Sequence, residues 1–489
     1  MPELNVPNRT LFHGDNLPFL RGLNSESVHL IATDPPFNKG RDFHATPDSL
    51  ARGAKFQDRW KWDDDVQGEW VDQITDDWPK VMNVINGARE SYGDDMGAFL
   101  CFMAVRLIEM HRVLRSDGSI YLHCDPTASH YLKALMDALF GPDGFKTEIS
   151  WKRTSAHSDA RQGRRQHGRI RDLILFYTKG GTWTWNQLYT EYDASYVNSM
   201  YRHVEPETGR RYRLDNLTGP GGAAKGNPQY EVMGVTRYWR YSQQQMQGLI
   251  DAGRVIQTKP GRVPSYKRYL DEMPGVPLQD SWDDINPIGS GARERVGYPT
   301  QKPLALYERI INASSNEGDI VLDPFAGCAT TPVAAERLGR KWVGADIWDG
   351  ALEVVKQRME DNRQLLTDPN PQIHYITESP ERTDEAEEAV PFLQVKERYK
   401  EPEGTRMSRQ EMFEYLIAQN GQRCQGCDRT FDDQLYLELD HNTPRSQGGW
   451  NHIMNRVLLC GPCNRIKSNV YTLEGLRREN RKRGRMAEK

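Results

Sequence analysis

The 489-residue sequence has no hydrophobic run of the length that a membrane-spanning helix needs, about 20 residues. Its most apolar stretch, residues 97–110, is shorter and contains Arg106 and Glu109, so it is interpreted as a core-facing amphipathic helix. The N-terminus also lacks a basic segment followed by an apolar run, and no signal peptide is predicted. We therefore expect a cytoplasmic protein that makes no membrane contact.

The sequence also lacks a strong excess of charge of either sign, with a formal net charge of -4. A uniformly basic nucleic-acid binder is excluded, and any contact with nucleic acid has to come from local patches. No repeat of solenoid period is evident. The length exceeds what one hydrophobic core supports, so two or three domains are expected.

Strands and helices are predicted to alternate up to about residue 180 and again after residue 300, which is typical of an α/β doubly wound sheet. Regularity fades over residues 181–300, which we interpret as an inserted recognition lobe. Residues 366–405 are rich in Pro and Glu and predict an acidic linker. The predicted domains are therefore residues 1–365 and a small C-terminal domain, residues 406–489, with a basic tail.

The individual elements can be predicted from periodicity and turn residues. Strands are expected at residues 10–14, 27–34, 119–125, 320–325 and 341–347, and helices at residues 97–115, 130–141, 304–314, 330–339 and 351–360. Residues 147–153 and 172–180 are expected to pair as antiparallel strands. A loop rich in Trp and Asp is predicted over residues 56–78.

Cysteine is scarce and unevenly placed. Three of the seven cysteines, Cys101, Cys124 and Cys328, are isolated and are interpreted as reduced thiols. The other four form two C-x-x-C pairs, namely Cys424 with Cys427 and Cys460 with Cys463. In a reducing compartment this spacing indicates metal rather than disulfides, and four thiolates suit a tetrahedral structural zinc ion.

An acid, two prolines and an aromatic residue follow one of the predicted strands, as Asp34-Pro35-Pro36-Phe37. Proline donates no backbone N–H and restricts φ, which explains why the strand ends there. It does not explain the acid and the aromatic ring beside the turn. Taken alone, the segment fits a solvated strand end as well as a functional loop.

A second motif, residues 321–331, is a strand, a turn with small residues and the start of a helix. Such turns lie at the carboxyl end of a strand, where ligands bind in α/β sheets. Asp346 ends the next strand, where it could bond a ribose hydroxyl or simply cap a helix. The spacing G-x-G-x-x-G is missing, which disfavours a dinucleotide-binding dehydrogenase.

These motifs, with Tyr-Pro-Thr-Gln-Lys-Pro at residues 298–303, resemble those of the amino-methylating DNA methyltransferases. That family methylates the exocyclic amine of adenine or cytosine with S-adenosylmethionine. The acidic loop precedes the cofactor turn, which is similar to the β class, and the resemblance covers roughly residues 8–365. It implies a methyltransferase sheet in permuted order, S-adenosylmethionine as cofactor and double-stranded DNA as substrate.

The resemblance implies roles for the residues of the acidic loop. Asp34 and the Pro35 carbonyl would accept hydrogen bonds from the target amine, and the two prolines, with Pro36, would hold the loop in one shape. Phe37 would stack on the flipped base, and Asn38 would line the pocket. An acid in the first position favours adenine N6, while cytosine N4 remains the alternative.

The resemblance also implies a set of cofactor-binding residues. Its members are Asp15, Lys302, Asp323, Phe325, Gly327 and Asp346, with Asp346 on the ribose and Asp15 beside the adenine. This chain has Gly327-Cys328-Ala329 where the family often has Gly-Ser-Gly. Close approach of a cofactor then requires a negative φ at Ala329.

Sequence recognition would fall to residues 181–300 and to the basic stretch 151–172, whose many Arg residues suit phosphate contacts. The alternative for that stretch is a solvated charged loop. Its basic and histidine residues are Lys152, Arg153, His157, Arg161, Arg164, Arg165, His167, Arg169 and Arg171.

Between and within its two C-x-x-C pairs and just after them, the C-terminal domain carries Asp440-His441, Asn455 and Cys463-Asn464. This set resembles the motif of the HNH nucleases in their zinc-clamped ββα form. By that resemblance His441 is the general base, Asp440 and Asn464 bind a divalent metal such as Mg²⁺, and Asn455 fixes the loop that carries the histidine. Lys467 is near enough in sequence to meet a DNA phosphate. The alternative is a zinc-stapled domain that binds DNA without cutting it.

The sequence thus favours a modification enzyme and a nuclease fused in one chain, as in a one-chain restriction–modification enzyme. Two alternatives stay open: a methyltransferase with a DNA-binding zinc domain, and a non-catalytic S-adenosylmethionine-binding regulator. The recognition sequence and the oligomeric state, a dimer included, are not determined by these patterns.

Overall fold

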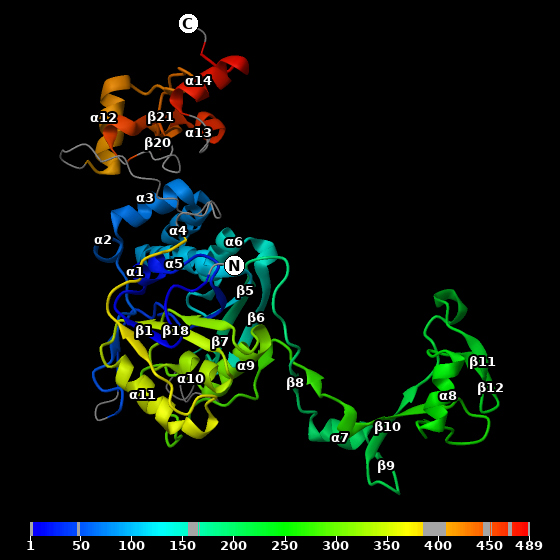
Figure 1. The fold of residues 1–489 in the computed structure, drawn as a ribbon. Helices are drawn as coiled ribbons and strands as arrows, with labels where there is room; N and C mark the ends of the chain where they lie inside the picture. The colour runs from blue at the N-terminus through cyan, green and yellow to red at the C-terminus, as the bar shows by residue number, and fades with distance from the viewer. Residues whose placement is uncertain are drawn as a thin grey trace. The chain divides into compact units, whose positions relative to one another are not determined.

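The structure is a computed structural model that describes residues 3–45, 49–154, 165, 167–384, 407–443, 450, 452–467 and 472–487. Two compact units are distinguished (Figure 1), with Trp185–Asp280 forming the second and the remainder of the chain the first. The predicted lobe at residues 181–300 contains this second unit, which is shorter at both ends.

A nine-stranded sheet forms the centre of the first unit, in the order β16-β6-β7-β5-β2-β17-β18-β1-β19. The strands are β1 (Thr10–His13), β2 (Val28–Thr33), β5 (Leu114–Cys124), β6 (Phe145–Lys152), β7 (Arg171–Thr178), β16 (Ser281–Trp282), β17 (Ile320–Asp323), β18 (Lys341–Asp346) and β19 (His374–Ile376). Neighbouring strands from β5 to β19 run parallel, whereas β7 runs antiparallel to β5 and β6. The predicted doubly wound sheet and the predicted antiparallel pair are both confirmed.

Helices cover this sheet, and those predicted are present. They are α1 (Asn16–Gly22), α5 (Asp94–Val113), α6 (Ser129–Phe140), α9 (Leu304–Ser314), α10 (Thr330–Arg337) and α11 (Ala351–Asp361). The core is built from their apolar faces and from the central strands, with Phe19, Phe99 and Leu122 fully buried. The apolar stretch 97–110 is therefore a core helix.

The prediction of a loop over residues 56–78 is wrong for most of its length. The segment contains α2 (Trp62–Asp65) and α3 (Gly68–Asp77), and α4 (Pro79–Ser91) follows with proline in its first turn. Trp70 and Ile74 lie one helical turn apart and are both buried, so α3 is amphipathic despite its acids. A short hairpin of β3 (Phe43–His44) and β4 (Lys55–Phe56) precedes these helices.

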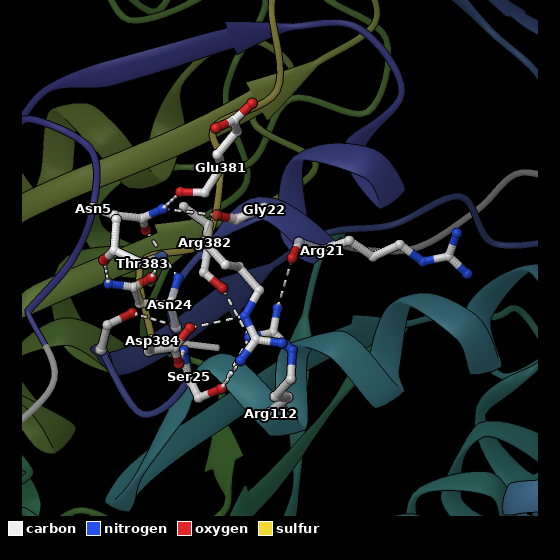
Figure 2. A network of polar contacts seen from close by, with 12 residues as sticks. Asn5, Arg21, Gly22, Asn24, Ser25, Arg112, Glu381, Arg382, Thr383 and Asp384 are labelled. Atoms are coloured by element: carbon white, nitrogen blue, oxygen red, sulfur yellow. Dashed lines mark hydrogen bonds and ion pairs between the residues drawn. The ribbon is translucent and has the colours of Figure 1, made fainter. Parts of the chain in front are cut away.

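The segment after α11 is part of the folded sheet domain, although a linker is predicted from residue 366. β19 pairs with β1, and residues 382–384 then bind the loop between α1 and β2, while the Glu381 carbonyl accepts a hydrogen bond from Asn5 (Figure 2). Asn24 and Thr383 exchange hydrogen bonds, Asp384 accepts the Ser25 N–H at 2.7 Å, and Arg382 reaches the Ser25 hydroxyl. The sheet domain thus extends to Asp384, and residues 385–405 of the predicted linker lie outside the described residues.

The second unit is a small α+β body. Its elements are β8 (Tyr189–Thr190), α7 (Ala194–Met200), β9 (His203–Val204), β10 (Arg211–Asn216), β11 (Gln229–Val232), β12 (Val235–Tyr238), α8 (Gln243–Asp251), β13 (Val255–Ile256), β14 (Ser265–Tyr269) and β15 (Val276–Pro277). Four of them form a sheet in the order β13-β14-β10-β9. A separate small core surrounds Trp239, which is fully buried.

The C-terminal domain comprises α12 (Arg409–Asn420), β20 (Leu437–His441), β21 (Arg456–Cys460), α13 (Gly461–Lys467) and α14 (Leu473–Lys482). β20 and β21 pair antiparallel and lead directly into α13, which is the ββα arrangement predicted for this region. Leu459 and Leu476 are fully buried beside the four cysteines of the two C-x-x-C pairs.

Candidate active sites

The carboxyl ends of four parallel strands, β1, β2, β17 and β18, meet at one edge of the large sheet. The acids that follow or end these strands are Asp15, Asp34, Asp323 and Asp346. All four line one cavity of about 1390 Å³, together with Phe37, Lys302, Phe325 and Gly327. The structure therefore brings together, around one cavity, every acid predicted for methyl transfer and cofactor binding.

Asp34 lies directly after β2 and has two different carboxylate oxygens. Oδ2 accepts a hydrogen bond from the Lys302 ammonium, which is itself 6% exposed. Oδ1 is buried and has no hydrogen-bond partner in the part of the chain that the structure describes. A buried acceptor without a donor is costly unless a ligand supplies one. Asp34 is thus prepared to accept an N–H from a molecule in the cavity.

Phe37 is almost fully buried, with 6% of its surface exposed, and it lines the same cavity. Its ring stacks on His123 with 5.7 Å between centroids, and the ammonium groups of Lys39 and Lys302 each lie 4.9 Å from its centre. His123 in turn contacts the Asp172 carboxylate at 3.2 Å. No pattern in the sequence indicates that His123 and Asp172 support the aromatic ring.

Asp323 ends β17 and is 4% exposed. Its Oδ1 accepts hydrogen bonds from the Thr33 hydroxyl at 2.7 Å and from the Phe325 N–H at 3.1 Å. Burial raises the pKa of this carboxyl to about 7, against the effect of these donors. Asp323 thus joins the ends of β17 and β2 and shapes the turn that follows.

The cofactor turn between β17 and α10 closes against Asp346. One carboxylate oxygen of Asp346 accepts the Gly327 N–H at 2.7 Å and the other accepts the Trp348 N–H at 2.8 Å. Gly327 has φ +52°, and a side chain there would meet Tyr298 at 3.1 Å. Ala329 has φ +63°, so the negative φ that the sequence interpretation required is not adopted. The turn accommodates a left-handed alanine instead.

Asp15 caps the N-terminus of α1 and accepts a hydrogen bond from the Leu17 N–H. It also pairs with Arg106 of α5 at 2.7 Å, and Arg106 donates to Asn16 as well. Burial lowers the pKa of Arg106 to about 10. The sequence shows Arg106 only as a charge that interrupts an apolar helix, because nothing in its neighbourhood links it to Asp15.

Arg358 is a second buried arginine that the sequence does not indicate. It projects from α11 and donates to the Cys328 carbonyl at 2.6 Å and to the Thr330 hydroxyl at 3.1 Å. These bonds fix the end of the cofactor turn from behind. Trp348 and Tyr298 add aromatic surface to the cavity wall, with 5.8 Å between their rings.

The basic stretch 151–172 is described only at its ends. Residues 155–164 and 166, which include His157, Arg161 and Arg164, lie outside the described residues. Arg153 pairs with Asp172, and Arg171 forms a double hydrogen bond with Asp283. These two arginines are therefore engaged by carboxylates, while Arg165, His167 and Arg169 are exposed.

The four cysteines of the C-terminal domain converge as predicted. The Sγ atoms of Cys424, Cys427, Cys460 and Cys463 lie within 4.8 Å of one another, and all four side chains are buried. Asn480 of α14 donates to Cys463 at 3.3 Å, and the Cys460 N–H donates to Cys424 at 3.2 Å. Four buried thiols with such donors fit a tetrahedral zinc ion.

Asn455, for which a role as loop anchor is predicted, bonds residues on both sides of the segment after His441. Its amide donates to the carbonyls of Thr443 and Trp450, each at 3.0 Å, and accepts the Thr443 N–H at 2.8 Å. The loop that begins after His441 is thereby tied at both ends. His441 itself is buried at the end of β20 with Arg456 at 3.3 Å from its Nδ1.

The predicted metal ligands lie at the start of α13 and on the neighbouring strand. Asp440 forms an ion pair with Lys467 at 2.8 Å, and Asn464 donates to Glu438. Glu438 is absent from the predicted set, although it is two residues before Asp440 and so on the same face of β20. Lys467 is 1% exposed, so the expectation that it meets a DNA phosphate is wrong.

Two protein families match separate parts of this chain. The family described as "DNA methylase" matches residues 28–357, and the family described as "HNH endonuclease" matches residues 424–470. Type II methyltransferase M.EcaI from Enterobacter cloacae is 31% identical over 287 residues, covering 58% of this chain and 62% of that protein. The chain thus spans less than two thirds of the length of this relative.

DNA adenine methyltransferase YhdJ from Escherichia coli K12 is 27% identical over 353 residues, covering 72% of this chain and 83% of that protein. The crystal structure of the M1.HpyAVI–SAM complex aligns with a TM-score of 0.32 and 16% identity, over 71% of this chain and 98% of that one.

Among the described residues, none of the helices combines the length and the apolar character that crossing a bilayer requires.

Proposed function

Because the chain belongs to the DNA methylase family, whose match spans residues 28–357, we propose that it methylates an exocyclic amine in double-stranded DNA. The observation that carries this proposal is Asp34 Oδ1, a buried acceptor that has no partner among the described residues and lies on the wall of the large cavity. A non-catalytic regulator that only binds S-adenosylmethionine would have no use for such an acceptor beside an aromatic ring.

The residues of the cofactor turn line the same cavity and suit S-adenosylmethionine. Gly327 leaves room against Tyr298 where any side chain would fill it, and Asp346 presents a carboxylate beside the turn. Each carboxylate oxygen can accept a second hydrogen bond, so Asp346 can hold a ribose hydroxyl in addition to its backbone donors. The cofactor, when bound, supplies a methyl group on a positively charged sulfur atom.

The protein's own residues then prepare the amine. A base has to leave the duplex to reach the cavity, at a cost of roughly a few kcal/mol. Stacking on Phe37 offsets this cost, since base–aromatic stacking contributes roughly 1–3 kcal/mol. Asp34 Oδ1 and the Pro35 carbonyl accept the two N–H bonds and favour a tetrahedral nitrogen whose lone pair is free to form the new bond.

Proton release completes the chemistry on the protein side. The methylated nitrogen carries one proton too many, and Asp34 Oδ1 is a buried acceptor among the cavity-lining groups. The ammonium of Lys302 occupies the other oxygen, Oδ2, and so fixes the orientation of the Asp34 carboxylate for this task. No cysteine nucleophile is needed, and Cys328 and Cys124 are buried thiols whose pKa is raised by that burial.

Adenine N6 is the favoured target. The acid in the first position of the loop supports this choice, and the relative YhdJ is described as a DNA adenine methyltransferase. The test is mass spectrometry of nucleosides from DNA incubated with the protein and S-adenosylmethionine. N6-methyladenine is expected; N4-methylcytosine alone would refute the choice of base and keep the mechanism, and no methylated base would refute both.

Residues 185–280 are proposed to contact the DNA around the target. Exposed arginine and lysine side chains of this unit, among them Arg237, Arg240 and Arg262, can meet phosphates, while Arg210 and Arg254 are held by Asp271 and Glu272. Removal of Arg237 and Arg262 together should weaken DNA binding and reduce its salt dependence.

For the C-terminal domain we propose a zinc-stapled, metal-dependent nuclease that acts on DNA. Oxygen atoms of Asp440, Asn464 and Glu438 form a donor set that suits Mg²⁺, which would polarise the scissile phosphate. His441 would take the proton of the attacking water. The fused chain would then carry both activities of a restriction–modification enzyme.

A domain that binds DNA without cutting is the second candidate, and one observation favours it. The Lys467 ammonium already neutralises Asp440 at 2.8 Å, which weakens that carboxylate as a metal ligand. Incubating plasmid DNA with the protein and Mg²⁺ distinguishes the two. Nicks or double-strand breaks support the nuclease, while retarded but intact DNA supports the second candidate.

A further inference from the structure

Asp58 lies outside every motif of the sequence, yet its carboxylate binds the backbone of the catalytic loop, defined as residues 34–40. Oδ1 accepts the Asn38 N–H at 2.6 Å, and Oδ2 accepts the Lys39 N–H at 3.0 Å. The Asp58 carbonyl accepts a third bond from the Gly40 N–H at 3.0 Å. Three successive amides of one loop therefore point at one residue, which is 1% exposed.

The loop segment that Asp58 binds has an unfavourable backbone conformation. Asn38 has φ +59°, in the left-handed region, which asparagine adopts more readily than other side chains but only glycine adopts without a steric penalty. Asn38 follows Phe37 directly, so its φ decides where the loop turns after the stacking ring. Something has to hold this turn, and the carboxylate of Asp58 is the group that bonds its amides.

We propose that Asp58 is a positioning residue that holds the catalytic loop in the conformation in which Phe37 and Asp34 face the substrate. The proposal rests on the proposed methyl transfer for its kinetic consequences. Its structural part stands independently, because the hydrogen bonds to Asn38 and Lys39 can be observed without any turnover.

Burial opposes ionisation of the Asp58 carboxyl, and neighbouring groups favour it. Burial raises its pKa to about 6, while Lys39 and the bonded amides act in the opposite direction. Asp42 lies next to the Asp58 N–H and is itself paired with Arg59 at 3.0 Å. Near neutral pH the ionised carboxylate can accept hydrogen bonds from both backbone N–H groups, those of Asn38 and Lys39. When Asp58 is protonated, one of its oxygens carries a hydrogen that faces one of these N–H groups, and that hydrogen bond is lost.

The first test is Asp58→Asn, which keeps the shape but presents an amide donor to one of the two N–H groups. Misplacement of the loop should lower kcat by about 10- to 100-fold, with KM for S-adenosylmethionine changed by less than about threefold. Asp368→Asn is the matched control, since the Asp368 carboxylate also accepts a backbone N–H, that of Asn370 at 3.0 Å, and Asp368 is not among the residues that line the large cavity. It should retain wild-type kcat.

Adding Asn38→Gly to Asp58→Asn should recover part of kcat, because glycine adopts a positive φ without strain. A purely structural role of Asp58 elsewhere in the fold would show no such recovery. Equal kcat of wild type and Asp58→Asn would overturn the proposal.

Hydrogen exchange of the wild-type protein provides a readout that needs neither a variant nor activity. Amides of residues 38–40 should be protected at pH 8, and their protection factors should fall as the pH drops through about 6. Protection that does not change between pH 8 and pH 5 refutes the role of Asp58. If wild type transfers no methyl group but this exchange pattern appears, the proposed function fails and the positioning role stands.

Discussion

The ammonium of Lys302 binds one oxygen of Asp34 and leaves the other oxygen buried, without a partner among the described residues. The two residues are far apart in the sequence and reach the cavity from different elements: Asp34 from the end of β2, and Lys302 from the segment before α9. This pairing fixes the orientation of the Asp34 carboxylate and reserves its free oxygen for a ligand. Predictions for the site start from these different roles of the two oxygens.

Replacing Asp34 should separate binding from transfer. Asp34→Ala removes the acceptor for the amine but touches no residue of the cofactor turn, so methyl transfer should fall at least about 10²-fold while S-adenosylmethionine still binds. Phe37→Ala should be milder, at about 10- to 100-fold, because only stacking is lost. Radiolabelled methyl incorporation and calorimetric cofactor binding would be measured side by side; near-normal transfer by Asp34→Ala contradicts the assignment.

Gly327 should be required for cofactor binding, whereas Ala329 should not. A methyl group at Gly327 meets Tyr298 at 3.1 Å and has to adopt φ +52°, so Gly327→Ala should weaken S-adenosylmethionine affinity about tenfold or more. Ala329→Gly suits the observed φ of +63° and should leave the affinity unchanged. Titration calorimetry would measure the affinity of both variants for S-adenosylmethionine. An equal loss of affinity in the two variants would show that the backbone φ does not control cofactor binding.

Asp323 should make the fold less stable at high pH. A carboxyl whose pKa is raised on folding stabilises the fold while it is neutral, and this contribution is lost as the pH rises through the folded value near 7. Asp323→Asn retains the Oδ1 acceptor for Thr33 and Phe325 and removes the charge. Its thermal midpoint should exceed that of wild type at pH 8 and approach it below about pH 4, where the carboxyl is protonated in the unfolded chain as well, as measured by differential scanning calorimetry.

Gly22 should be essential for binding of the segment that follows β19. A Cβ atom there would lie 2.0 Å from the Pro380 carbonyl oxygen, so Gly22→Ala should destabilise the sheet domain by about 1–3 kcal/mol. Gly87 lies inside α4 with open space around it, and Gly87→Ala should stabilise by up to about 1 kcal/mol. The urea midpoint of unfolding should fall for Gly22→Ala and rise for Gly87→Ala. A rise for both variants would show that Pro380 moves away from position 22 without an energetic cost.

The two activities should separate under metal removal. EDTA at a level that strips Mg²⁺ but not thiolate-bound zinc should stop cleavage and spare methylation, and His441→Ala should do the same. Cys460→Ser should unfold the C-terminal domain instead, because structural zinc contributes folding free energy directly. Plasmid nicking and methyl incorporation would be scored together. Loss of methylation in His441→Ala would contradict independent domains.

Several features of this protein follow from local sequence alone. The four acids predicted for methyl transfer and cofactor binding stand near the ends of predicted strands, and the order of these strands along the chain is enough to indicate a cofactor turn and a catalytic loop. The spacing of the two C-x-x-C pairs is likewise enough to indicate a zinc site. Such signals can be recognised because the chemistry depends on neighbours within a few positions of one another.

Other features are decided only by tertiary structure. The sheet places β1 between β18 and β19, so residues from both ends of the methylase region become neighbours, and residues 381–384 bind beside Asn24. Arg106, Arg358 and Asp58 reach the site from helices and loops whose sequence carries no motif. A hydrogen bond between distant residues leaves no periodicity or spacing, because chain folding alone sets the distance between its two atoms.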